Sequence, residues 1–154
     1  MDDIEVIKIF KNSMSHINSS ISPLPKATLG LRGTQLPDGN LVVCGGSSAS
    51  VKSDDYFHYK DGSNQWIQIG TMERARSAHS SVYMDGFLFT IGGLDSSGDP
   101  TKPLAHHEEF SIHGGVKERK TMPIALLDHT ATVFSPHKML VCGGWDEYVS
   151  KILF

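Results

Sequence analysis

Three short stretches of this chain repeat one pattern: LVVCGG at residues 41–46, LFTIGG at 88–93 and MLVCGG at 139–144. In each stretch an apolar run leads into a glycine pair, as expected for a buried strand that ends at a sharp backbone position. The pairs begin at residues 45, 92 and 143, so they stand 47 and 51 residues apart. A period of that length predicts a repeat protein in which each unit is one small supersecondary structure.

Each glycine pair closes a predicted β-hairpin. In the first two copies, Asp38-Gly39 and Asp85-Gly86 supply residues that accept the positive φ angles of a tight turn, and β-branched and aromatic residues flank them. The third copy has SPHK at the turn and is one residue longer between its histidine and its glycine pair. We expect the turn alone to absorb the extra residue.

Two further strands follow each hairpin. A polar loop leads to a short strand that ends in an aromatic residue, at Tyr59, Phe110 and Phe154, and QWIQIG then reads as a fourth strand with Trp66 seven residues after Tyr59. Phe10 and the stretch 16–25 fit the third and fourth strands of a preceding unit. The unit is therefore predicted to be a meander of four short antiparallel strands.

These features together resemble the kelch repeat, which has a glycine pair after its second strand, an aromatic residue about 13 positions later, a tryptophan seven further on and a basic His-Ser stretch opening the next repeat. The second unit departs from the pattern with Lys117 at the tryptophan position, and the third reads IALLDH in place of the arginine stretch. Within 1–154, the resemblance divides the chain into a half unit, two whole repeats and a truncated repeat, at 4–25, 28–72, 74–122 and 124–154.

The resemblance implies an all-β fold of kelch-type β-propeller blades, each a four-stranded antiparallel meander. About three to three and a half blades are expected here, which is an incomplete ring, because propellers have four to eight blades. A blade buries its faces only against neighbouring blades. We therefore expect the chain either to be part of something longer, or to self-associate, for example as a homo-dimer that completes a propeller.

Composition narrows the classes of partner. The formal net charge is −3 and the lysines and arginines are dispersed, so neither nucleic acid nor a membrane surface is an expected partner. The first residues lack the features of a secretory signal, which favours a cytoplasmic location, although the sequon Asn18-Ser19-Ser20 points toward secretion. Cys44 and Cys142 occupy equivalent places two repeats apart and are expected to be buried free thiols.

The glycine pairs also suggest a backbone cradle for a phosphate group. No Gly-Lys-Ser/Thr helix start follows any of them, so we interpret Gly45, Gly46, Gly92, Gly93, Gly143 and Gly144 as structural glycines at crowded strand ends. The stretch HHEEF at 106–110 has the composition of a metal site. Neighbours on a strand point to opposite faces, so it splits into two pairs, neither of which makes a full ligand set, and we expect an exposed, charged strand.

Two segments contain candidate partner-binding residues. The basic stretch that opens the second hairpin fits an anion-binding cluster, although structural hydrogen bonds are the favoured interpretation. The loop 94–107 is longer than its counterpart 47–55 and is either a recognition element or tolerated length. The candidates from both segments are Arg74, Arg76, Asp95, Asp99, Lys102 and His106.

The repeat aromatics Tyr59, Trp66 and Phe110 are expected to pack within and between blades, as are Tyr56 and Phe57. We find no catalytic, cofactor-binding or metal-binding set, and expect no enzyme activity and no cofactor. The kelch resemblance implies a scaffold that binds protein partners through its loops, with roles in substrate recruitment or cytoskeletal association. The alternatives are a fragment of a propeller enzyme, similar to galactose oxidase or to a sugar-acid epimerase, and a truncated product without function.

Overall fold

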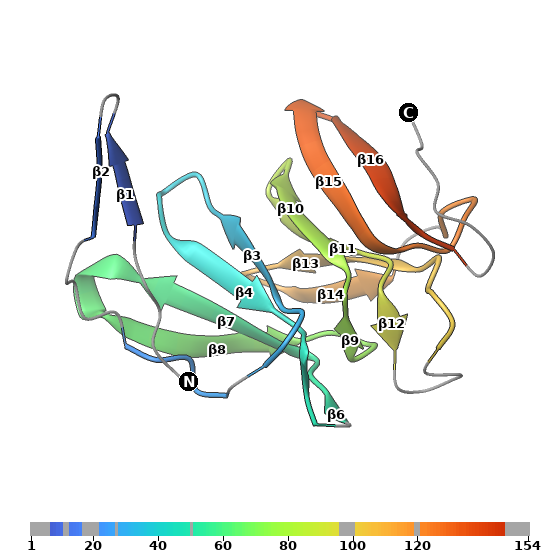
Figure 1. The fold of residues 1–154 in the computed structure, drawn as a ribbon, viewed down its shortest axis with the longest axis horizontal. Coiled ribbons are helices and arrows are strands. Elements are labelled where there is room, and N and C mark those ends of the chain that lie inside the picture. Colours follow the sequence, from blue (N-terminus) through green and yellow to red (C-terminus); the bar gives the residue numbers. More distant parts are fainter. Residues whose placement is uncertain are drawn as a thin grey trace.

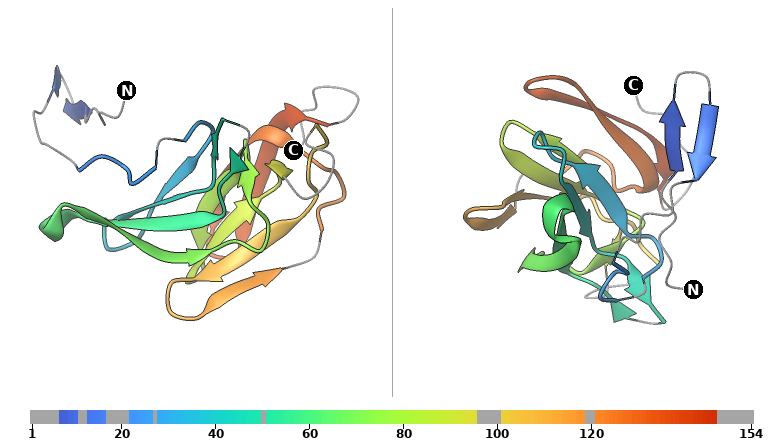
Figure 2. Two further views of the ribbon diagram at one scale, coloured as in Figure 1. Left: turned by 90° about the horizontal axis from the view of Figure 1, so that it is seen from below. Right: turned by 90° about the vertical axis from the view of Figure 1, so that its left-hand side faces the viewer.

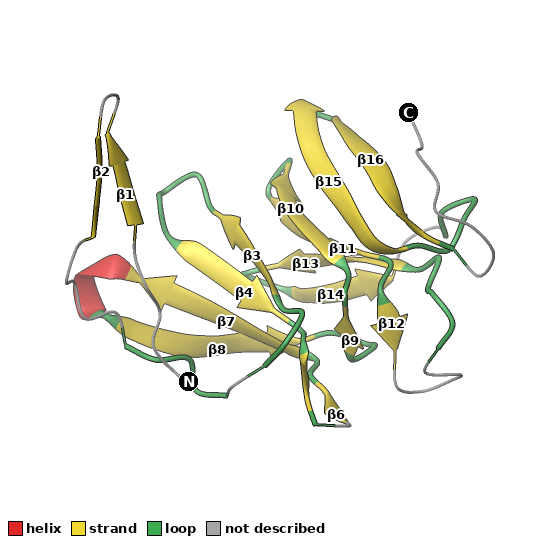
Figure 3. Cartoon of the chain, viewed as in Figure 1, coloured by secondary structure: helices red, strands yellow, loops and turns green. Residues whose placement is uncertain are grey.

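The computed structural model describes residues 7–10, 13–16, 22–26, 28–49, 51–95, 101–118 and 121–146. These residues form strands joined by loops, with one short 3-10 turn, η1 (Asp61–Ser63), between two of the strands (Figure 3). The alternation of apolar and polar residues read from the sequence accounts for this, because it gives each strand one buried face and one exposed face.

Two four-stranded antiparallel sheets form the centre of the molecule (Figure 1). The first has the order β3 (Arg32–Gln35), β4 (Leu41–Cys44), β7 (Asp55–Lys60) and β8 (Gln65–Thr71). The second has the order β10 (Ser80–Met84), β11 (Phe87–Ile91), β13 (His107–Ser111) and β14 (Gly115–Glu118). The predicted four-stranded meander is confirmed in both sheets.

Four two-stranded pairs complete the described strands. β15 (Leu127–Ser135) and β16 (Lys138–Trp145) form a hairpin that packs beside the second sheet (Figure 1). β1 (Ile7–Phe10) and β2 (Ser13–His16) form another hairpin, which stands apart from the first sheet (Figure 2). The short pairs are β5 (Ser47–Ser48) with β6 (Val51–Lys52), and β9 (Arg76–Ser77) with β12 (Leu94–Asp95). The described strands do not close a ring, and the division at residues 28, 74 and 124 stays a prediction.

The turns differ from one hairpin to the next. Asp85 and Gly86 have φ angles of 51° and 86° and form the predicted two-residue turn, whereas residues 36–40 form a longer loop with Gly39 at 88°. The prediction for the third hairpin is wrong: residues 136–137 form a two-residue turn, and the extra residue is a β-bulge at Phe134, between the paired residues Val133 and Ser135. A bulge leaves one residue unpaired, so the extra length did not have to change the turn.

The hydrophobic core lies between the first and second sheets. Val42, Cys44 and Tyr56 from the first sheet meet Leu88 and Phe110 from the second, and all five are buried. The rings of Tyr56 and Phe110 stack with centroids 4.2 Å apart, which adds a directional contact to the burial of apolar area. The sheets are therefore held face to face by side chains that alternate along their strands.

The repeat aromatics pack in two ways. Tyr59 and Trp66 lie opposite each other on β7 and β8 with ring centroids 5.0 Å apart, and the indole Nε1 of Trp66 donates to the Ser22 carbonyl at 2.9 Å. In the second sheet Phe110 pairs with Val116, so Val116 and not Lys117 holds the place of Trp66. The connection between those strands is one residue shorter than in the first sheet, and counting residues alone misplaced the position.

Each hairpin begins at a residue with left-handed backbone geometry. Gly30, Ala78 and Asp128 have φ angles of 67°, 55° and 51°. The amide of Ala78 donates to the Gly30 carbonyl at 3.2 Å, and the amide of Asp128 donates to the Ala78 carbonyl at 2.9 Å. This backbone series aligns the starts of three successive units, side by side.

Two buried histidines pack between successive units. The Nε2 atom of His79 lies 3.3 Å from the Cys44 Sγ of the preceding unit, and Nε2 of His129 lies 2.8 Å from the Ser80 Oγ. Burial first, and then the nearby arginines, lowers the pKa of His79 from 6.5 to about 3. Burial and Arg32 lower the pKa of His129 to about 4. Both rings are neutral at pH 7.

We expect acid to destabilise the fold from about pH 6.5 downward. Both histidines have a lower pKa folded than unfolded, so the unfolded chain takes up protons first as the pH falls. The stability that the two neutral rings contribute is fully present above pH 6.5. It is lost as the pH falls toward 4 for His129 and toward 3 for His79. From pH 6 to pH 5 the free energy of unfolding should fall by about 1 kcal/mol for each histidine.

Urea unfolding at several pH values measures this slope. His79→Gln should remove the part of the pH dependence that comes from His79. His113→Gln, at an exposed position, is the matched control and should leave the slope unchanged. A slope that is the same in His79→Gln and in the wild type would contradict the assignment.

Candidate functional site

One end of the two sheets carries their longest connections. The short strands β6, β9 and β12 lie at this end, together with the loop that reaches residues 101–106 (Figure 1). Four exposed or half-exposed side chains stand on these connections, and Lys26, on the segment before β3, borders the same depression as two of them. We call the five the loop face: Lys26, Val51, Lys52, Arg74 and Lys102.

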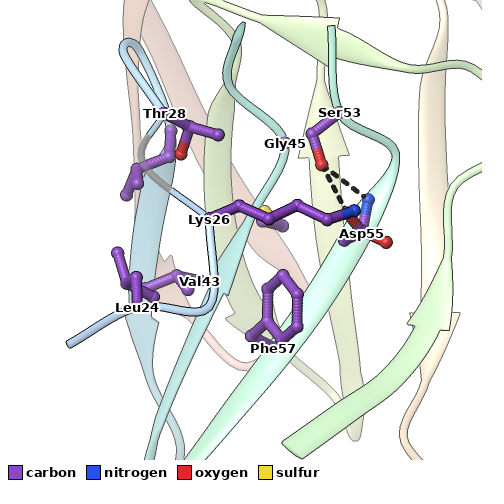
Figure 4. Close-up of a pocket in the computed structure, with 10 residues that line it drawn as sticks. Leu24, Lys26, Thr28, Val43, Gly45, Ser53, Asp55 and Phe57 are labelled. Carbon is purple, nitrogen blue, oxygen red and sulfur yellow. Dashed lines mark hydrogen bonds and ion pairs between the residues drawn. The ribbon is translucent and has the colours of Figure 1, made fainter. Parts of the chain in front are cut away.

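A small pocket opens beside Lys26 on the first sheet (Figure 4). The Lys26 side chain extends across it, and its Nζ binds the Asp55 Oδ2 at 2.6 Å. Ser53 Oγ donates to the same oxygen at 2.8 Å, and Gln68 Nε2 donates to the other carboxylate oxygen at 2.7 Å. Asp55 is therefore almost fully satisfied by hydrogen bonds inside the protein.

The charges in this pocket hold each other in the ionised state. Burial of Asp55 opposes ionisation, but the hydrogen bonds from Lys26 and Ser53 and the charge of Lys26 outweigh it, so the pKa of Asp55 lies below its ordinary value. The hydrogen bond to Asp55, reinforced by its charge, raises the pKa of Lys26. The pair closes the pocket with an ion pair and leaves no poised acid or base.

Asp95 receives one contact from its own unit, from Arg74, and one from the preceding unit, from Lys52. The guanidinium of Arg74 lies 3.3 Å from the Asp95 carboxylate, and Lys52 Nζ donates to the Asp95 carbonyl at 2.6 Å. Asp95 is buried, with 4% of its surface exposed, whereas Arg74 keeps about a third of its side chain in solvent. The loops of neighbouring units thus support one another, as a preformed recognition surface requires.

The prediction that Arg76 binds a partner is wrong, because the structure places its side chain in the interior. Arg76 and Glu108 are both fully buried and form an ion pair. Arg76 also donates to the carbonyls of Gly92 and His106, each at 3.0 Å. A guanidinium enclosed in this way cannot reach a partner, so the structural interpretation of this stretch is the correct one for Arg76.

Glu108 shows that the expected exposed, charged strand at 106–110 is also wrong. Glu108 and Glu109 are buried on β13, and the Glu108 carboxylate accepts hydrogen bonds from the Glu73 and Arg74 amides at 2.8 and 3.2 Å. Glu108 is a site residue that sequence reasoning noted only as part of a charged run. Its partner Arg76 lies 32 residues away, so no local signal identifies the pair.

The remaining predicted partner-binding residues lie either near the loop face or outside the described residues. Lys102 is exposed and His106 half-buried near the loop face, and Asp99 lies outside the described residues. Lys26, Lys52 and Val51 belong to the face but were missed, because each sits in a short connection whose place depends on the fold. Their exposure is the only property that marks them.

Comparison with known proteins finds similar repeats in other chains. No family model matches the chain. The human Kelch repeat and BTB domain-containing protein 8 is 28% identical over 117 residues, which cover 70% of this chain and 19% of that protein. Beta-scruin of Limulus polyphemus is 38% identical over 57 residues, covering 37% and 6%, and human Kelch-like protein 21 is 35% identical over 52 residues, covering 34% and 9%. The chain carries repeats of the kelch type, similar to those of these proteins.

This kelch chain spans a fifth or less of the length of each of these relatives. The expected kelch features now have positions in space. The second strand ends at the glycine pair, the aromatic residue stands on the third strand, and Trp66 stands opposite it on the fourth. The described β-structure consists of kelch blades and parts of blades.

Five of the six glycines in the pairs, all except Gly143, are crowded by atoms of the described residues. A Cβ atom on Gly93 would lie 2.5 Å from the Ser77 carbonyl oxygen, and one on Gly144 would lie 2.6 Å from that of Leu127. Both glycines have φ angles near 90°, a region that other residues rarely adopt. These contacts supply a structural reason for the glycines in the kelch pattern.

The cysteines of the kelch chain differ in burial. Both are free thiols; Cys44 is buried as predicted, but Cys142 is only half-buried, which corrects the expectation that both lie in the core. Burial raises the pKa of Cys44 to about 12. Within the described residues, no group of three or more His, Cys, Asp or Glu could hold a metal ion, and no helix is long and apolar enough to cross a membrane.

Proposed function

We propose that this kelch chain acts by binding protein partners, with the loop face as the recognition surface. The carrying observation is that exposed side chains of the loop face stand on connections that are tied together across two blades. Rigid sheets that present loops at one end are a common platform for recognition. A non-enzymatic role also agrees with the names of the relatives, which are those of repeat proteins.

Val51 is the centre of the proposed surface. It is 72% exposed at the tip of the β5–β6 hairpin and borders an open depression of about 440 Å³ together with Lys26, Ser48 and Lys52. An exposed apolar side chain beside two lysines can bury area against a partner, while the remaining N–H donors of Lys26 and Lys52 hydrogen-bond to its acidic groups. Substrate recruitment and cytoskeletal association are both proposals that such a surface allows, in a cytoplasmic setting.

Selection of peptide ligands tests the surface. The chain would be immobilised, peptides would be selected from a random phage-displayed library, and their dissociation constants would be measured by fluorescence polarisation. We expect Val51→Glu to weaken binding at least tenfold, which is about 1.4 kcal/mol, because it places a charge in the contact.

Ile67→Glu is the matched control, since Ile67 is 49% exposed on β8, away from the loop face. It should leave the dissociation constants unchanged. Peptides that bind Val51→Glu as tightly as the wild type, or that lose affinity with Ile67→Glu, would place the recognition surface elsewhere.

A further inference from the structure

The same contact joins successive units twice within this chain. A Cβ atom on Gly45 would lie 2.5 Å from the Arg76 carbonyl oxygen and 2.6 Å from Cε1 of His79, both in the next unit. A Cβ atom on Gly92 would lie 2.5 Å from the Leu126 carbonyl oxygen and 2.7 Å from Cε1 of His129. The first glycine of a pair is therefore the seat on which the start of the following unit packs.

The third unit carries this seat uncovered. A Cβ atom on Gly143 would meet nothing within 4 Å in the described part of the chain. Cys142 pairs with Thr130 in the register in which Cys44 pairs with Arg32, so Leu140 stands at the place of Val42. Val42 is fully buried, whereas Leu140 is 39% exposed. Leu140, Cys142 and Gly143 form an apolar seat, which we call the acceptor face.

The first unit carries the other half of the contact. Gly30 aligns with Ala78 through the left-handed backbone series, so Thr28, Leu29 and Leu31 correspond to Arg76, Ser77 and His79. Those three residues of the second unit are buried. Leu29 is instead 80% exposed, and Thr28 and Leu31 are only half-buried. We call these three residues the donor edge.

We propose that the 154-residue chain binds a second copy of itself head to tail, with the donor edge of one copy seated on the acceptor face of the other. The two surfaces are the halves of one contact that occurs twice inside the chain, so the intermolecular contact continues an established interface. Leu31 would take the place of the buried histidine beside Cys142, where an apolar side chain meets an apolar seat. The Gly30 amide of one copy would then face the Asp128 carbonyl of the other, extending the backbone series.

Head-to-tail association makes a sharp prediction because the two surfaces of an interface are different. Leu29→Glu destroys the donor edge but keeps the acceptor face, and Leu140→Glu does the reverse. Each variant alone should have the mass of one chain, 16.9 kDa, by light scattering after size exclusion, whereas the wild type should have at least twice that mass. An equimolar mixture of the two variants should regain a dimer, held by the one intact contact.

Circular dichroism on each peak confirms that the variants are folded, which is expected because both positions are exposed, and Ile67→Glu should associate like the wild type. A second measurement locates the contact: in a Leu31→Cys variant, a short bismaleimide should link the introduced thiol of one copy to Cys142 of another, and adding Cys142→Ser should abolish the product. A monomeric wild type would overturn the proposal. So would an unchanged mass in both glutamate variants, or a mixture that stays monomeric.

Discussion

Arg76→Met should lower the free energy of unfolding by about 3–5 kcal/mol, the usual cost of removing one partner from a buried ion pair. Arg76 and Glu108 are both fully buried. Among the described residues, the substitution leaves the buried carboxylate of Glu108 with the Glu73 and Arg74 amides as donors. It also leaves the Gly92 and His106 carbonyls without the guanidinium that binds both of them.

Urea unfolding measures this loss, with Arg32→Met as the control. Arg32 is paired with Asp128 and both side chains are partly exposed, so its loss should cost less than about 1 kcal/mol. The double variant Arg76→Met/Glu108→Leu should recover most of the stability, because it removes the uncompensated charge together with its partner. Equal losses in Arg76→Met and Arg32→Met would show that the buried pair is not a stability determinant.

The glycine seats provide the second large effect. Gly45→Ala should cost about 2–5 kcal/mol, since a left-handed backbone costs an L-residue about 1–2 kcal/mol and forced overpacking costs about 1–3 more. The added Cβ would lie 2.5 Å from the Arg76 carbonyl oxygen, and a backbone atom cannot move aside as a side chain does. The strain therefore acts on the contact between two units.

Gly143→Ala is the matched control within the same motif, with both alanine variants made in the Leu29→Glu background so that no second copy covers Gly143. Gly143 has a φ of 70°, close to the 64° of Gly45, but the described residues leave its Cβ position open. The loss of stability should therefore contain only the cost of a left-handed backbone at an L-residue, about 1–2 kcal/mol. The difference between the two variants in denaturant unfolding isolates the packing term. If Gly45→Ala and Gly143→Ala lose the same stability, the crowding at Gly45 has no energetic weight.

The sequence predicted what is local and periodic. The glycine pairs and the aromatics of the third strands recur at regular positions, so four-stranded meanders followed from the pattern alone. The errors arose where the number of residues between two positions does not determine which residues pair across the strands. Lys117 was placed opposite the aromatic residue by counting, but a shorter turn puts Val116 there, and a bulge at Phe134 took up a residue that the turn was expected to hold.

The candidate site was less accessible to prediction because its contacts are remote in sequence. The ion pairs of Lys26 with Asp55 and of Arg76 with Glu108 join residues 29 and 32 positions apart. Charged residues are usually exposed, so Glu108 reads as a surface residue until its buried partner is known. The exposure of Val51 likewise depends on how a short hairpin stands away from the sheet.

The backbone series through Gly30, Ala78 and Asp128 has a consequence for how this kind of chain can change over time. Only one of these three left-handed positions is a glycine, and neither the hairpin loops nor the spacing between units is constant. What stays constant is a torsion angle and a hydrogen bond at the start of each unit. The repeat is thus better preserved in backbone conformation than in amino-acid sequence. Substitutions and length changes can accumulate while the spacing of the units in the structure is kept.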